Sequence, residues 1–198
     1  MKSLENLVWI DCEMTGLDVE KDSLVEIAVL VTDSDLNILD EDGLSVVIKP
    51  RPESFSQMGD FVTQMHKESG LLPLLAEGLE IADAEKKILD YVKGFAPEVR
   101  TAPLAGNSIG TDRMFLNRYM PKLDAHLHYR NIDVSSVKEL TKRWFPKVYF
   151  QLPKKSGGHR ALADIRESIA ELRYYRQTVF VEQPGPESEA AKQIADQL

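Results

Sequence analysis

The chain has 198 residues, of which 43% are hydrophobic and 28% charged, a composition typical of a globular protein with one sizeable core. The single cysteine, Cys12, excludes an internal disulfide and fits a reducing compartment. A net charge of −8 argues against a protein that tracks a long nucleic acid, because such proteins neutralise many phosphates with a basic surface. No targeting pattern or membrane-spanning apolar run is visible, so we expect a cytoplasmic protein without membrane association.

The first half of the chain predicts three strands joined by short connections. Residues Val8–Met14 alternate in polarity, and Val25–Thr32 and Leu44–Ile48 are rich in β-branched residues. The turn signal Asp42-Gly43 separates the second and third runs. Short connections favour an antiparallel arrangement of these strands.

Helical patterns alternate with short apolar runs in the second half. The runs Ala102–Gly106 and Tyr129–Val134 predict buried parallel strands in βα units. The helices are expected at Gln57–Glu68, Ile81–Phe95, Arg113–Tyr119, Val137–Phe145 and Ala161–Thr178. The order βββαβαβα predicts an α/β fold with a mixed five-stranded sheet, three antiparallel strands and then parallel ones, flanked by helices.

We expect one domain over residues 1–183. The segment Pro184-Gly185-Pro186 then breaks the last helix. Residues 184–198 are expected to form a tail, either mobile or a short docking helix.

Asp11 and Glu13 form the first candidate for chemistry. In an extended strand the two side chains lie on the same face, roughly 6–7 Å apart. Their carboxylates repel each other unless a cation lies between them. The alternative is a solvated edge strand, but apolar residues on both faces favour a central strand, where unpaired acids are costly.

Three later residues complete the candidate set. Asp112 follows a predicted buried strand and opens a helix, where a carboxylate can also serve merely as a cap. His159 and Asp164 lie five apart, after a glycine-containing loop and at the start of a long helix. Taken alone, His159 is more often a solvated loop residue. Together, four carboxylates and a histidine suit a site that holds two divalent cations and cuts phosphodiesters with an activated water.

The order of these five residues resembles the DEDDh group of 3′→5′ exonucleases, which have a ribonuclease-H-like fold. Three longer stretches are similar to the oligoribonuclease family in particular. They are Trp9-Ile-Asp-Cys-Glu-Met-Thr-Gly-Leu17, Gly106-Asn-Ser-Ile-Gly-Thr-Asp-Arg-Met-Phe-Leu116 and His128-Tyr-Arg-Asn-Ile-Asp-Val134. The resemblance covers roughly residues 6–180. It implies an enzyme that degrades very short oligoribonucleotides, especially 5′-phosphorylated dinucleotides, to mononucleotides.

The resemblance also implies roles for the candidate residues. Asp11, Glu13 and Asp164 are expected to ligate one Mg²⁺ or Mn²⁺ ion, since carboxylate oxygens suit these cations. Asp11 is expected to bridge to a second cation, to which Asp112 contributes directly or through water. His159 is expected to take the proton from the attacking water.

Substrate contacts are implied for two further groups. Leu17 is expected to wedge between bases and Phe61 to stack on one, although family members often carry tryptophan in place of Phe61. Without the family, both are equally well surface or core apolar residues. His66 is expected near the ribose end, with a helix-surface histidine as the alternative. A cap on the 5′ phosphate is implied for Ser108, Arg130, Ser135 and Ser136.

Tyr129 resembles the residue that reaches into the active site of the partner subunit, and the alternative is a packed strand tyrosine. The resemblance therefore implies a homodimer that is required for activity.

Three rival interpretations stay open at this point. The nearest is a proofreading-type DEDDh exonuclease that acts on longer DNA or RNA ends. A catalytically silent nucleic-acid-binding module would lack one or more carboxylates, and all four are present. A small-molecule-binding protein with a structural metal would show a compact ligand cluster in the sequence, and none is seen.

Overall fold

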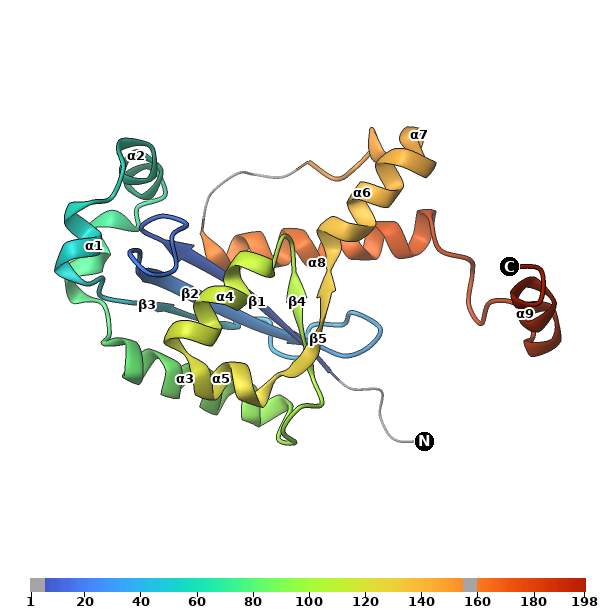
Figure 1. Cartoon of the computed structure of the whole chain (residues 1–198), viewed down its shortest axis with the longest axis horizontal. Helices are drawn as coiled ribbons and strands as arrows, with labels where there is room; N and C mark the ends of the chain where they lie inside the picture. Colours follow the sequence, from blue (N-terminus) through green and yellow to red (C-terminus); the bar gives the residue numbers. More distant parts are fainter. Residues whose placement is uncertain (1–5, 155–159) are drawn as a thin grey trace.

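A mixed five-stranded sheet forms the centre of the structure, a computed structural model that describes residues 6–154 and 160–198 (Figure 1). The strand order is β3-β2-β1-β4-β5. Strands β1, β2 and β3 pair antiparallel, whereas β4 and β5 run parallel to β1. Their bounds are β1 Leu7–Met14, β2 Leu24–Thr32, β3 Leu44–Val47, β4 Pro103–Gly106 and β5 His128–Asp133. This is the predicted sheet, and its central strand β1 carries Asp11 and Glu13.

Helices cover both faces of the sheet. Helix α8 packs on one face, and α3, α4 and α5 lie on the other (Figure 1). Within residues 6–154 and 160–198, no helix has the length and apolar character needed to cross a bilayer. The helices are α1 Pro52–Ser56, α2 Asp60–Glu68, η1 Leu72–Glu77, α3 Ile81–Phe95, α4 Gly110–Tyr119, α5 Pro121–His126, α6 Val134–Trp144, α7 Pro146–Tyr149, α8 Ala161–Thr178 and α9 Ser188–Ala195.

Successive side chains of β1 point to opposite faces of the sheet and contribute to two separate core clusters. Val8, Ile10 and Cys12 point into the larger cluster beneath α3, α4 and α5. Trp9 points to the opposite face, where α8 packs, and its indole N–H donates a hydrogen bond to Thr32 Oγ1 at 3.0 Å. Since Asp11 and Glu13 follow the parity of Trp9, their side chains emerge on the α8 side of the sheet.

Several short helices were not predicted from the sequence. Helices α1, α5 and α7 each begin at a proline, which fits the first helical position because the N–H it lacks would have no helical partner. Helix α6 begins three residues earlier than predicted, because the Asp133 side chain accepts a hydrogen bond from the Ser135 N–H at 2.9 Å. Helix α4 begins at Gly110, so Asp112 lies inside its first turn.

The prediction that the fifth strand is buried is wrong. β5 is one of the two edge strands of the sheet, with β4 as its neighbour, and most of its residues are exposed. Tyr129 is 71% exposed and Ile132 is 37% exposed. An edge strand has only one strand beside it, so its polar side chains remain in water.

The chain beyond Gln183 contains one helix, α9, which stands away from the sheet at the C-terminal end (Figure 1). None of its residues is buried. Whether residues 184–198 act as a mobile tail or dock elsewhere stays a prediction.

Candidate active site

Three carboxylates converge at the end of β1. Asp11 and Glu13 come from the strand, and Asp164 comes from the first turn of α8. Each offers an oxygen, and these oxygens all lie within 4.8 Å of one another. They meet because α8 crosses the same face of the sheet from which the two strand residues emerge. Such a spacing leaves room for one cation held by oxygen ligands.

The Asp112 side chain is hydrogen-bonded to the backbone of the same strand, β1. Its Oδ1 accepts a hydrogen bond from the backbone N–H of Cys12 at 3.0 Å, between the two strand acids. That N–H is available because β4 pairs with β1 only at Val8 and Trp9. β4 ends at Gly106, where a side chain would come within 3.1 Å of the Ile10 carbonyl oxygen.

Burial and mutual repulsion raise the pKa values of these acids. Burial, followed by Asp112 and Glu13, raises the pKa of Asp11 to about 9. Burial, followed by Asp164 and Glu26, raises the pKa of Glu13 to about 8. Burial also raises the pKa of Asp112 to about 6. Negative charge is therefore concentrated beyond what the fold alone accommodates, and a bound cation would relieve it.

Sequence reasoning missed Glu26, a fifth acid beside the site. Glu26 pairs with Glu13 in the β1–β2 register and is 1% exposed. Arg160 binds it at two points, with Nη2 to Oε1 at 2.9 Å and Nε to Oε2 at 3.2 Å. Ser45 Oγ donates a third hydrogen bond at 2.7 Å. One charged residue in the otherwise apolar strand Leu24–Val31 was the available signal.

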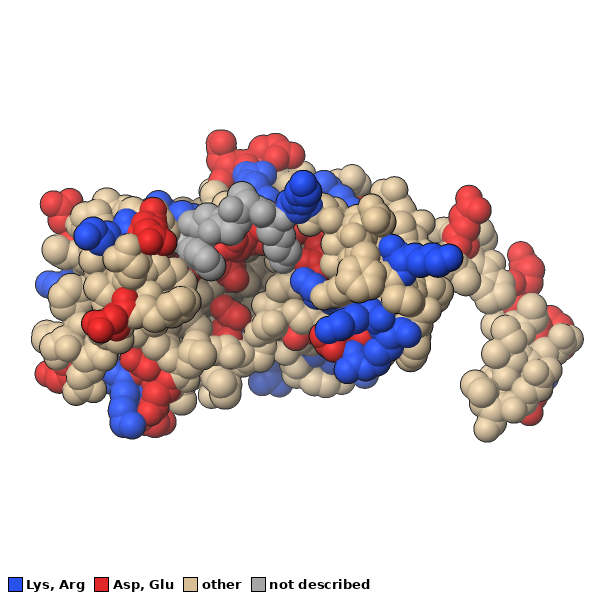
Figure 2. All heavy atoms as spheres, turned by 90° about the horizontal axis from the view of Figure 1, so that it is seen from above, with Lys and Arg blue, Asp and Glu red and all other residues tan. Residues whose placement is uncertain are grey.

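These carboxylates fit the predicted divalent cations. Asp11, Glu13 and Asp164 supply the hard oxygen donors that Mg²⁺ and Mn²⁺ prefer. Asp112 lies outside this group of three and is held next to it by the Cys12 N–H. In Figure 2 acidic side chains lie in a hollow of this face, with a group of basic side chains beside it.

Leu17 lies in the turn that follows β1, where it is 76% exposed. The Asp22 carboxylate fixes this turn by accepting hydrogen bonds from Thr15 Oγ1 and from the Asp18 N–H, both at 2.9 Å. Gly16 allows the close approach, because a side chain there would come within 2.5 Å of Asp22. The turn therefore presents an apolar side chain to solvent beside the acidic cluster.

Helix α2 carries Phe61 and His66. Phe61 is 81% exposed, as a residue that stacks on a base would be. The helix-surface alternative for His66 is wrong, since its ring is fully buried. Nε2 lies 2.8 Å from the Met14 carbonyl oxygen and must donate to it, and Nδ1 lies 4.0 Å from Glu13 Oε2. His66 therefore fixes α2 against the end of β1.

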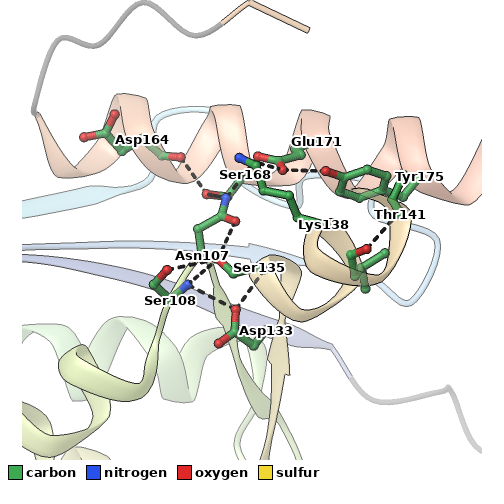
Figure 3. Close-up of polar contacts among 11 residues, drawn as sticks. Asn107, Ser108, Asp133, Ser135, Lys138, Thr141, Asp164, Ser168, Glu171 and Tyr175 are labelled. Carbon is green, nitrogen blue, oxygen red and sulfur yellow. Dashed lines mark hydrogen bonds and ion pairs between the residues drawn. The ribbon is translucent and has the colours of Figure 1, made fainter. Parts of the chain in front are cut away.

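Two of the predicted phosphate-cap residues are in contact. Ser108 and Ser135 lie with their hydroxyl oxygens 3.0 Å apart, and the Ser108 N–H donates to Ser135 Oγ at 2.9 Å (Figure 3). Asp133 also accepts from the Ser108 N–H, at 3.1 Å. Ser108 is exposed and Ser135 is half-buried at the N-terminus of α6, whose N–H groups favour an anion.

The other predicted cap residues lie on or next to β5. Arg130 is exposed, and its guanidinium carbon lies 5.3 Å from the centre of the Tyr129 ring. The Tyr129 ring in turn lies 4.5 Å from the ring of His128. Ser136 is exposed in the first turn of α6. His159, the predicted general base, lies outside the described residues.

Comparison with known proteins places this geometry in a class of enzymes. The sequence matches the Exonuclease family (RNase_T) over residues 8–172, which includes all five predicted catalytic positions. The fold and the acidic cluster thus define a nuclease of the exonuclease class.

Curated relatives then narrow the class. The chain is 63% identical to the oligoribonuclease of Leifsonia xyli subsp. xyli over 94% of this chain and 90% of that protein. It is 58% identical to the oligoribonuclease of Streptomyces griseus over 98% of this chain and 96% of that protein. The chain therefore belongs to the oligoribonuclease family.

Solved structures support the fold. A zinc-bound complex of Escherichia coli exonuclease I with single-stranded DNA superposes with a TM-score of 0.63 at 16% identity. Exonuclease I from Methylocaldum szegediense superposes with a TM-score of 0.61 at 21% identity. Each match covers 88% of this chain but only 41% of the other, so the chain corresponds to less than half of those proteins. At these identities the likeness concerns the exonuclease fold alone.

Proposed function

We propose that the chain is a 3′→5′ exoribonuclease that converts very short oligoribonucleotides, above all 5′-phosphorylated dinucleotides, to mononucleotides. The observation that carries the proposal is the convergence of Asp11, Glu13 and Asp164 at the end of β1. Relatives of 58–63% identity that are named oligoribonucleases support the choice of substrate. The net charge of −8 agrees with it, because a dinucleotide requires few phosphate contacts.

The carboxylates are assigned to two divalent cations, Mg²⁺ or Mn²⁺. Asp11, Glu13 and Asp164 would hold one ion, and Asp11 together with Asp112 would hold the second. Such ions supply charge stabilisation at the attacking and leaving oxygens of an in-line displacement. The raised pKa values of Asp11 and Glu13 support this assignment, because they arise from crowded negative charge. His159 would accept the proton of the attacking water.

Substrate length would be set by two groups of residues. Leu17 and Phe61 offer exposed apolar surfaces to the bases. Ser108, Arg130, Ser135 and Ser136 would bind the 5′ phosphate and close the groove at about two nucleotides. His66 is buried, so we assign it to the placement of α2 beside the ribose end and not to an open surface.

The proposal includes a homodimer in which Tyr129 reaches the partner's site. The exposed edge strand β5 and the 71% exposure of Tyr129 support it. An exposed edge strand presents unpaired backbone groups with which another chain can pair, and a two-fold axis would place the same strand of both copies at the interface.

A length series tests the function. We expect 5′-phosphorylated RNA of two nucleotides to be cleaved much faster than RNA of five or twenty nucleotides in Mg²⁺, and not at all in chelator. Equal or faster cleavage of the twenty-nucleotide strand, or of a DNA strand of that length, would contradict a closed groove. It would favour the general exonuclease instead.

A further inference from the structure

A chain of hydrogen bonds joins the predicted phosphate cap to α8, the helix that carries Asp164 (Figure 3). Its central residue is Asn107, which directly follows β4. Asn107 Oδ1 accepts a hydrogen bond from Ser135 Oγ at 3.1 Å, and its Nδ2 donates to Ser168 Oγ at 2.8 Å. Ser168 Oγ then donates to the backbone carbonyl oxygen of Asp164 at 2.9 Å. The link ends on the residue whose side chain lies in the acidic cluster.

A buried carboxylate fixes the orientation of the Asn107 amide. Glu171 is 2% exposed, and its Oε2 lies 3.3 Å from Asn107 Nδ2. Its Oε1 accepts from the Tyr175 hydroxyl at 2.8 Å and lies 3.4 Å from Lys138 Nζ. A carboxylate accepts hydrogen bonds and does not donate them, so the amino group of Asn107 must face α8. The carbonyl of the amide therefore faces Ser135.

This orientation also determines the direction of the hydrogen bonds in the cap. The hydroxyl hydrogen of Ser135 points to Asn107, so Ser135 Oγ accepts from both the N–H and the hydroxyl of Ser108. Ser108 has a φ of +54°, in the left-handed region that residues other than glycine seldom adopt. Unusual backbone of this kind persists where the surroundings hold it in place, and here Ser135 supplies part of that hold.

We propose that Asn107 is a positioning residue that couples the 5′-phosphate cap to the placement of Asp164. The proposal rests on the proposed function and deepens it. The hydrogen bonds of Asn107 go to Ser135, Ser168 and Glu171, and none of these is a predicted metal ligand. It holds Ser135 on one side and, through Ser168, the first turns of α8 on the other. A phosphate in the cap then lies at a fixed distance from the carboxylates, as selection for a dinucleotide requires.

The coupling predicts a loss that depends on the substrate. Misplacement by about 1 Å costs roughly 10²-fold in rate, and it matters most where two anchor points must be met at once. We expect Asn107→Ala to lower kcat/KM for the 5′-phosphorylated dinucleotide by about 10–100-fold. The 5′-hydroxyl dinucleotide, which does not use the cap, should lose much less. The wild-type preference for the 5′ phosphate should therefore largely disappear.

The experiment compares full-length wild type, Asn107→Ala, Ser168→Ala and the control Asn117→Ala on both dinucleotides in Mg²⁺. Asn117 is exposed on α4 and donates to Asp124 Oδ2 at 3.0 Å, outside the site, so its loss controls for removal of an amide. Circular dichroism establishes folding of each variant. If Asn107→Ala does not fold, Ser168→Ala tests the proposal, because it removes the hydrogen bonds between Asn107 and the Asp164 carbonyl.

A collapsed 5′-phosphate preference in Asn107→Ala and Ser168→Ala, with Asn117→Ala unchanged, supports the coupling. Equal loss on both dinucleotides means a merely structural role and overturns it, and so does a retained preference. A wild type that shows no preference for the phosphorylated dinucleotide contradicts the proposed function itself. This failure of the proposed function can be told apart from a failure of the coupling, because it is measured on the wild type alone.

Discussion

Arg160 and Glu26 form a two-point ion pair that fastens the start of α8 to the middle of the sheet. Arg160 immediately precedes α8, and Glu26 lies beside Glu13 on the neighbouring strand. The Arg160 side chain is 39% exposed, whereas that of Glu26 is 1% exposed. The pair thus compensates a buried carboxylate at the edge of the acidic cluster. It also holds the helix turn that carries Asp164.

Arg160→Ala should destabilise the fold and lower activity. Removing one partner of a buried pair costs about 3–5 kcal/mol, and we expect about 2 kcal/mol here because Arg160 is partly solvated. Urea unfolding measures the loss. Arg166→Ala, one turn into α8, is the matched control, because Arg166 pairs with the exposed Glu41 and its loss should cost at most about 0.5 kcal/mol. Equal losses in the two variants would show that the Arg160 pair has no special role.

The metal-free protein should become less stable as the pH rises. The folded pKa values of Asp11 and Glu13, about 9 and about 8, lie above the ordinary values of 3.8 and 4.5. The folded state therefore binds protons more tightly than the unfolded state. The stability gained in this way is complete below about pH 4 and is lost as the pH rises toward 8–9. Melting temperatures in chelator between pH 5.5 and 8.5 test the sign.

Asp11→Asn should remove much of this pH dependence. At pH 8 in chelator the variant should melt higher than wild type, because folding no longer requires this buried side chain to take up a proton. Mg²⁺ or Mn²⁺ should no longer raise its melting temperature. Asp90→Asn is the control, since Asp90 is exposed and pairs with Lys86 on α3. A metal-free wild type that grows more stable toward pH 8.5 would contradict the crowded-carboxylate account.

His159→Ala should reduce turnover by about 10²–10⁴ and leave metal binding intact. The reason is chemical: an imidazole that titrates near neutral pH is suited to accept the proton of the attacking water. Single-turnover cleavage of the dinucleotide measures the rate, and calorimetric titration with Mn²⁺ measures binding. Near-normal turnover would remove His159 from the role of general base.

Mixing two inactive variants tests the proposed dimer. If Tyr129 completes the partner's site, Tyr129→Ala and Asp11→Asn should each be nearly inactive alone. After subunit exchange, half of the dimers are mixed, and each contains one intact site, so roughly a quarter of wild-type activity should return. Asp11→Asn mixed with Asp164→Asn should stay inactive, because both defects lie in the same protomer's carboxylate cluster. Absence of recovery in the first mixture would contradict a shared site.

The sheet could be predicted from the sequence because its inner strands carry strong local signals. β2 is a nine-residue run of largely β-branched and apolar residues, and β1 alternates clearly. β5 was misjudged as buried although its segment contains Arg130, Asn131 and Asp133, which indicate an edge. The short helices α1, α5 and α7 were missed because four to six residues give too little periodicity, with only the initial proline as a signal.

The site was only partly accessible to residue-level reasoning. The common face of Asp11 and Glu13 follows from strand geometry alone. The approach of Asp164 depends on how α8 crosses the sheet, which no local pattern encodes, so the resemblance had to supply it. His66, Glu26 and Asn107 act through contacts between segments distant in the sequence, and their partners emerge only from the packed fold.

The most direct test of the central claim is conversion of a 5′-phosphorylated diribonucleotide to mononucleotides by wild type and by Asp164→Asn. The reaction is followed with Mg²⁺, after chelation, and after Mg²⁺ is restored. The account predicts rapid cleavage by wild type that stops with chelator and resumes with metal, and no cleavage by Asp164→Asn under any condition. Persistent cleavage in chelator, or full activity of Asp164→Asn, would contradict a metal-dependent carboxylate site at the end of β1.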